Sequence, residues 1–212
     1  MNLNYNYDKL RTSLRYWMQG RDMHVGLKAM QFGLDHHTGS RKDGTPEFSH
    51  QIFQAQYART LGSVLHPERL LATIFLHDIV EDCDVTRSAG EEMFGSDIAH
   101  SVHLMTDSDE RGIDLSHEQY FPRMADNPIS SLAKGIDRIH NFQSMLGVFD
   151  IPKQERYIKV TRDWILPMMK EARQRFVEQE PAYQNIKWVL LTQIELIEAM
   201  HNASLDLPNR EI

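Results

Sequence analysis

Apolar residues recur every three or four positions along most of the chain, which is the spacing of an amphipathic helix. Alternating apolar and polar positions between turn residues, the sign of a strand, are hard to find. The pattern predicts an all-α fold, a single helical bundle of roughly ten helices. We expect helices over Tyr7–Met18, Met23–His37, Glu47–Leu65, Pro67 to beyond Ile79, Ser88 to Gly95, Asp97–Met105, Pro128 to beyond His140, Lys153–Gln179 and Tyr183–Ala203.

Glycine, proline and capping residues set the expected boundaries of these helices. The segment Thr38–Pro46 reads as a loop, Ser88 with Glu91 resembles a capping box, and Pro167 should kink the helix that contains it. A second polar loop covers Thr106–Ser116. With no internal repeat or long linker, residues 1–212 are expected to form one domain, with a core at about 25–170 and C-terminal helices at about 171–206.

Composition excludes several classes of protein. The formal net charge of −7 disfavours a nucleic-acid partner, although a small anionic ligand needs only a few local cations. Cys83 is the single cysteine, so an intramolecular disulfide is impossible. The apolar runs are too short to cross a bilayer, and the N-terminus has no signal-peptide core. We therefore expect a cytoplasmic protein with no membrane partner.

The string His77-Asp78-Ile79-Val80-Glu81-Asp82 carries the most chemistry. On one continuous helix, His77 would lie over Glu81 and Asp78 over Asp82. A solvated charge run is the alternative, and it is disfavoured because the preceding residues 70–76 are apolar enough to require burial.

A cation at His77 and Asp78 would need donors from elsewhere in the chain. His50 lies in a polar stretch early in its predicted helix, and Asp137 lies beside the apolar face marked by Ile136 and Ile139. An unpaired buried carboxylate is costly, so Asp137 needs a cation or a hydrogen-bond partner. Two imidazoles with two carboxylates suit Mn, Fe, Co or Zn better than Mg.

Four segments in this order resemble the HD phosphohydrolase superfamily, and more narrowly the hydrolase domain of RelA/SpoT homologues and the small alarmone hydrolases. They are Arg41–Pro46 continuing to His50, His77–Asp82, Phe94–Ala99 and Lys134–Asn141. The resemblance covers about residues 25–170. It implies an all-helical, Mn²⁺-dependent enzyme that removes the 3′-pyrophosphate from (p)ppGpp, the nucleotide of the stringent response.

The resemblance also implies a role for particular residues. His50, His77, Asp78 and Asp137 would bind the metal, and Glu81 and Asp82 would orient and deprotonate the attacking water. Arg41 and Lys42 would approach the nucleotide, and Asn141 would hold its sugar and phosphate region. Lys134 and Arg138 form a second cation pair, for which ion pairing with local carboxylates is an alternative to substrate contact. An exposed basic turn is the alternative for Arg41 and Lys42.

Two other functions stay open. Glu47 and the segment from Gln174 onward depart from the family pattern, which leaves room for another substrate such as a deoxynucleoside triphosphate, a nucleoside monophosphate or NADPH. A binding module with a structural metal is the third possibility, and the Glu81–Asp82 pair argues against it. The sequence also leaves open a homo-oligomer that uses the long C-terminal helices.

Overall fold

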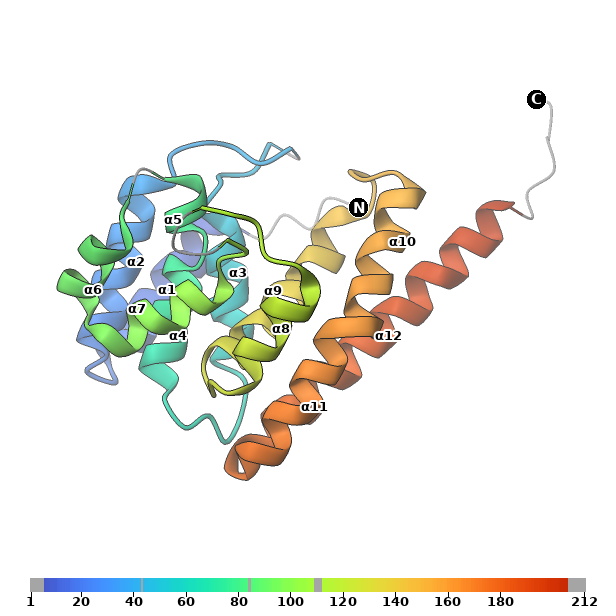
Figure 1. Ribbon diagram of the computed structural model, residues 1–212. Coiled ribbons are helices and arrows are strands. Elements are labelled where there is room, and N and C mark those ends of the chain that lie inside the picture. The colour runs from blue at the N-terminus through green and yellow to red at the C-terminus, as the bar shows by residue number, and fades with distance from the viewer. Residues whose placement is uncertain (1–5, 43, 84, 109–111, 206–212) are drawn as a thin grey trace.

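The computed structural model describes residues 6–42, 44–83, 85–108 and 112–205, and this part of the chain is all-helical (Figure 1). It contains no β-strand, only isolated bridges that pair Ser40 with Pro46 and Ser108 with Asp114. The predicted all-α class is therefore confirmed. None of the described helices is both long and apolar enough to cross a bilayer.

The helices follow one another with short connections. In order they are α1 (Tyr7–Gln19), α2 (His24–His36), α3 (Ser49–Ala58), α4 (Pro67–Leu76), α5 (Ile79–Asp82), α6 (Arg87–Phe94), α7 (Ser96–Met105), α8 (His117–Ala125), α9 (Ser130–Met145), α10 (Ile151–Val160), a π-helical turn (Thr161–Ile165), α11 (Leu166–Arg175), a 3-10 turn (Val177–Gln179) and α12 (Glu180–Leu205).

Helix α9 is the centre of the packing. It contacts α3, α4 and α7 on one side and α8, α11 and α12 on the other, and most of its side chains are buried. Figure 1 shows α10, α11 and α12 as a long layer beside the remaining helices. A Cβ atom at Gly135 would come within 2.8 Å of Ile186, so the glycine allows α12 to approach α9 closely. Residues on α9 are thus held from both sides.

A second close approach joins α2 to α4. A Cβ atom at Gly33 would lie 2.8 Å from the carbonyl oxygen of Phe75 and would overlap the ring of Phe48. Real side chains do not tolerate such distances, so only glycine lets these helices touch here. This contact holds the end of α4, from which His77 follows directly.

Several predicted boundaries were wrong. The helix at α3 ends at Ala58 rather than Leu65, and α6 is capped by Thr86, whose hydroxyl accepts the N–H of Ala89, rather than by Ser88. Helix α8 was not predicted, although it carries a capping box between Ser116 and Gln119.

The helix that contains Pro167 is interrupted by a π-helical turn that ends two residues before the proline. In the π-helical turn Thr161–Ile165, Leu166 donates its N–H to the carbonyl of Thr161. Because proline has no N–H to offer the preceding turn, a wider turn here reorganises the backbone bonds around it.

Candidate metal centre

The His77-Asp78 pair lies at a break between two helices. Helix α4 ends at Leu76, Asp78 adopts φ −96° and ψ 0°, and α5 begins at Ile79. The prediction of one continuous helix through Asp82 was therefore wrong. The imidazole Nδ1–H of His77 donates to the carbonyl of Ile74 at 2.9 Å, which leaves Nε2 facing the interior. Such a second-nitrogen bond fixes a histidine as it would be fixed in a metal site.

Four side chains from three parts of the chain meet at this break. His50 Nε2, from α3, lies 3.0 Å from Asp137 Oδ1, from α9. His77 Nε2 lies 3.1 Å from Asp78 Oδ2 and 3.8 Å from Asp137 Oδ1. Donor atoms of His50, His77 and Asp78 all fall within 4.8 Å of one another. The structure thus brings together all four predicted metal ligands, and their role as ligands stays a prediction.

The donor set fits one divalent cation. Ligand atoms about 2.1 Å from a shared cation lie about 3.0 to 3.4 Å apart. The two shortest separations here, 3.0 Å and 3.1 Å, fall in that range. His77 Nε2 is buried and makes no well-oriented hydrogen bond to any described residue. A buried polar atom without a partner is costly, and a cation would satisfy this one.

The electrostatics of the site favour positive charge. Burial alone would lower the pKa of His77, but the carboxylates of Asp78 and Asp137 raise it to about 10. Burial would raise the pKa of Asp137, yet Lys134 and the two histidines hold it well below its usual range. The carboxylate of Asp137 therefore stays ionised, and His77 retains its proton. A bound metal ion would supply the positive charge that this proton supplies in its absence.

Two residues that the sequence interpretation left out complete this centre. His140 Nδ1 lies 2.7 Å from His50 Nδ1, and Gln54 Nε2 lies 2.5 Å from His50 Nε2 and 3.1 Å from Asp137 Oδ1. Both are buried. Helical spacing could have identified them, because Gln54 follows His50 by one turn and His140 follows Asp137 by one turn.

The predicted catalytic carboxylates are only partly described. Glu81, in α5, accepts the backbone N–H of Asp107 at 3.0 Å. Although Glu81 is exposed on one side, partial burial of its carboxylate raises its pKa above the usual glutamate value. The side chain of Asp82 lies outside the described part of the structure, so its predicted role is untested.

Three of the predicted substrate residues line one surface pocket. Arg41, Lys42 and Asn141 surround a hollow of about 270 Å³ that also includes Phe149. Arg41 starts a tight turn closed by the N–H of Gly44, whose φ of 82° suits glycine. Asn141 also donates its side-chain N–H to Asp137 Oδ1 at 3.1 Å, so the pocket adjoins the metal centre.

The other two predicted substrate residues lie deeper. Lys134 Nζ is 3.5 Å from Asp137 Oδ2, so the ion-pair alternative holds for this residue. Arg138 makes no ion pair with a carboxylate among the described residues. Its guanidinium lies 4.5 Å from the ring centre of Tyr157, and only 8% of the residue is exposed. Lys134 is thus held by the protein itself, whereas Nε and Nη1 of Arg138 are buried without a hydrogen-bond partner among the described residues.

Glu47, which departs from the family pattern, has a structural partner. Its carboxylate accepts the N–H of Gly39 at 3.1 Å and lies 3.8 Å from His37 Nδ1. It therefore fastens the loop before α3.

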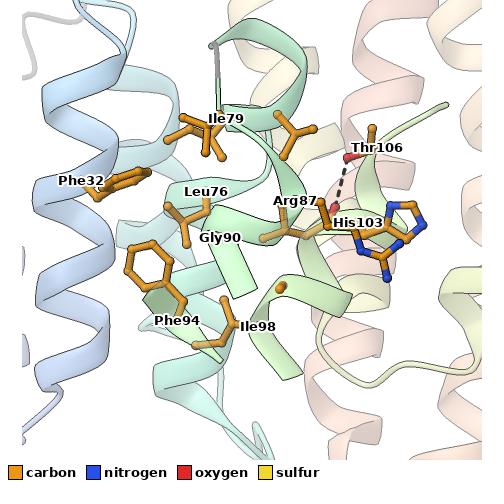
Figure 2. Close-up of a pocket in the computed structure, with 13 residues that line it drawn as sticks. Phe32, Leu76, Ile79, Arg87, Gly90, Phe94, Ile98, His103 and Thr106 are labelled. Atoms are coloured by element: carbon orange, nitrogen blue, oxygen red, sulfur yellow. Dashed lines mark hydrogen bonds between the residues drawn. The ribbon is translucent and has the colours of Figure 1, made fainter. Parts of the chain in front are cut away.

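An apolar pocket adjoins the helix break, because Leu76 and Ile79 on either side of the break line it. Figure 2 shows that Phe32, Leu76, Ile79, Phe94 and Ile98 line it, from α2, α4, α5, α6 and α7. Its volume of about 30 Å³ leaves room for about one water molecule. This pocket is too small and too apolar for a nucleotide, and it serves as packing behind the site.

Curated relatives match this chain over its motif-bearing region. A probable guanosine-3′,5′-bis(diphosphate) 3′-pyrophosphohydrolase of Synechocystis is 30% identical over 149 residues, covering 66% of this chain and 19% of the relative. A guanosine-3′,5′-bis(diphosphate) 3′-pyrophosphohydrolase of Vibrio cholerae is 25% identical over 172 residues, covering 77% and 24%. The chain thus spans about a fifth of the length of these relatives. No protein-family model matches it.

A solved structure agrees with the sequence matches. It is described as a metazoan ortholog of SpoT that hydrolyses ppGpp, and it aligns with a TM-score of 0.56 at 20% identity, covering 77% of this chain and 93% of that one. The chain is RelA/SpoT-like in sequence and fold.

Proposed function

We propose that this protein is a metal-dependent hydrolase that removes the 3′-pyrophosphate from a guanosine tetra- or pentaphosphate. The observation that carries the proposal is the meeting of His50, His77, Asp78 and Asp137 around an unsatisfied imidazole nitrogen. The names of the similar proteins support the choice of substrate. We further propose that residues 1–212 act as one domain.

Mn²⁺ is the proposed metal, because two imidazoles and two carboxylates suit a divalent transition ion and carboxylate oxygens suit manganese among them. When bound, such an ion lowers the pKa of water and withdraws charge from a phosphoryl oxygen. His50, His77, Asp78 and Asp137 would hold it.

The chain's own residues supply the remaining chemistry. Glu81 would take the proton of the attacking water, and its raised pKa brings it nearer the value that suits a general base at neutral pH. Arg41 and Lys42, beside the pocket that includes Asn141, would neutralise the phosphates of the nucleotide.

A product-resolved assay tests this function. Mn²⁺-loaded protein should release pyrophosphate and GDP from ppGpp, and the Asp78→Ala variant should not. Deoxynucleoside triphosphates and NADPH serve as competing substrates. Hydrolysis of one of these with no pyrophosphate from ppGpp would keep the metal chemistry and refute the alarmone substrate.

The Glu81→Gln variant separates catalysis from metal binding. We expect turnover to fall by about 10² to 10⁴ because the general base is removed, while Mn²⁺ affinity stays close to that of the unchanged protein. Unchanged turnover would show that another group accepts the proton.

A further inference from the structure

Gln54 occupies the space between two of the predicted metal ligands. It lies on α3, one turn after His50, and is 1% exposed. Its amide nitrogen is 2.5 Å from His50 Nε2 and 3.1 Å from Asp137 Oδ1. The amide therefore bridges the imidazole and the carboxylate, as a cation shared by them would.

The hydrogen bonds around Gln54 allow two tautomers of His50. When the Gln54 amide nitrogen donates to His50 Nε2, the proton of His50 is on Nδ1, facing His140 Nδ1 at 2.7 Å. When the proton is on Nε2, His50 instead donates to Asp137 Oδ1 at 3.0 Å. In the first arrangement His50 Nε2 and Asp137 Oδ1 are two acceptors only 3.0 Å apart, and a metal ion would displace the proton of the second arrangement. Both have lone pairs available for a metal ion.

The amide oxygen of Gln54 is unsatisfied. Oε1 is buried and accepts no hydrogen bond from the described residues, although buried carbonyl oxygens almost always have a partner. A cation that takes the lone pairs of His50 and Asp137 would leave the amide N–H groups without acceptors as well. Turning the amide by half a revolution about its last side-chain bond exchanges the two atoms, and presents the oxygen to that cation.

We propose that Gln54 supplies its amide oxygen as a further ligand of the metal ion, an inference that rests on the metal centre of the proposed function. The donor set then contains two nitrogens and three oxygens. Amide and carboxylate oxygens suit Mn²⁺, whereas Zn²⁺ is satisfied by four tetrahedral ligands. Gln54 therefore favours Mn²⁺ over Zn²⁺.

Metal affinity measured by calorimetric titration with MnCl₂ and with ZnCl₂ tests the proposal without reference to turnover. We expect Gln54→Leu to weaken Mn²⁺ binding by about 10-fold or more, and Zn²⁺ binding by less. Gln54→Glu should restore Mn²⁺ binding, because it returns an oxygen to the same place. Gln56→Leu is the matched control, since Gln56 lies on the same helix but donates to the carbonyl of Leu10.

The leucine and glutamate variants also separate a ligand from a packing residue. If Gln54 only filled space, Gln54→Leu would change Mn²⁺ affinity little and Gln54→Glu would lower it, because a buried charge disturbs packing more than an apolar side chain does. We expect the reverse. Unchanged Mn²⁺ affinity in Gln54→Leu, or an equal loss of both metals that glutamate does not restore, would overturn the proposal. If the unchanged protein binds Mn²⁺ through Gln54 but does not hydrolyse ppGpp, the proposed substrate fails and this inference stands.

Discussion

Replacing Lys134 by methionine should destabilise the metal-free protein more than the metal-bound protein. The Lys134 ammonium lies 3.5 Å from Asp137 Oδ2, and the two side chains are only 16% and 8% exposed. At an effective dielectric constant of about 20, this separation corresponds to an attraction of about 5 kcal/mol. Methionine avoids the cost of burying the ammonium, so we expect a net loss of about 3 kcal/mol from the free energy of unfolding.

Bound Mn²⁺ changes this result because it supplies positive charge to the same carboxylate. The loss caused by Lys134→Met should then be smaller by about 1.4 kcal/mol or more, and by linkage the variant should bind Mn²⁺ about tenfold more tightly. Urea unfolding followed by circular dichroism, once with a chelator and once with saturating MnCl₂, measures both losses.

An exposed ion pair provides the control. Lys159 lies 2.6 Å from Asp163, but their side chains are 78% and 44% exposed. Lys159→Met should therefore cost less than about 1 kcal/mol, equally with and without metal. Equal destabilisation by Lys134→Met in the two conditions would refute the reasoning, since it would show that Lys134 and the metal do not act on the same charge.

Three further predictions follow from other contacts. Mn²⁺ affinity should rise with pH up to about pH 10, because the ion must displace the proton retained by His77, whose pKa is raised to about 10. Calorimetry in buffers of different ionisation enthalpy should detect the released proton. Gly33→Ala should lower the free energy of unfolding, measured by thermal unfolding, by ~1 to 3 kcal/mol, since its Cβ would crowd Phe75. Gly62→Ala, which has open space around it, should lower it by less. Burial favours the neutral phenol of Tyr183 in the folded protein and raises its pKa from 10.0 to about 12. The contribution of this group to the free energy of unfolding is therefore complete below pH 10.0 and is lost as pH rises toward about 12. A Tyr183→Phe variant whose alkaline stability falls as steeply as before would contradict this assignment.

The sequence predicted which side chains lie together at the candidate metal centre better than it predicted the shape of the backbone that holds them. His77 and Asp78 were identified by the order of the polar residues, but the end of α4 at Leu76 was not, because apolar residues continue through Ile79 and Val80. Periodicity describes which face is buried and carries little information on where a helix breaks.

Helix α8 escaped prediction for a different reason. Pro122 lies within it and would ordinarily argue against a helix. Tyr120, Phe121, Met124 and Ala125 are all buried, and this packing outweighs the missing backbone bond. Helical spacing places Gln54 and His140 one turn from a predicted ligand, but both escaped because their contacts with a ligand on another helix, Gln54 with Asp137 and His140 with His50, are made only in the folded protein.

The π-helical turn at Thr161–Ile165 acts as a one-residue spacer in an otherwise continuous rod. An α-helix advances about 100° per residue, so the extra residue rotates α10 by about that angle relative to α11. Tyr157, which stacks on Arg138, faces α9 through this rotation. Removing a single residue from the turn would leave the length of the rod almost unchanged, but would swing Tyr157 off the buried guanidinium. The number of residues in the turn thus determines which way the side chains of α10 face, as much as the identity of those residues does.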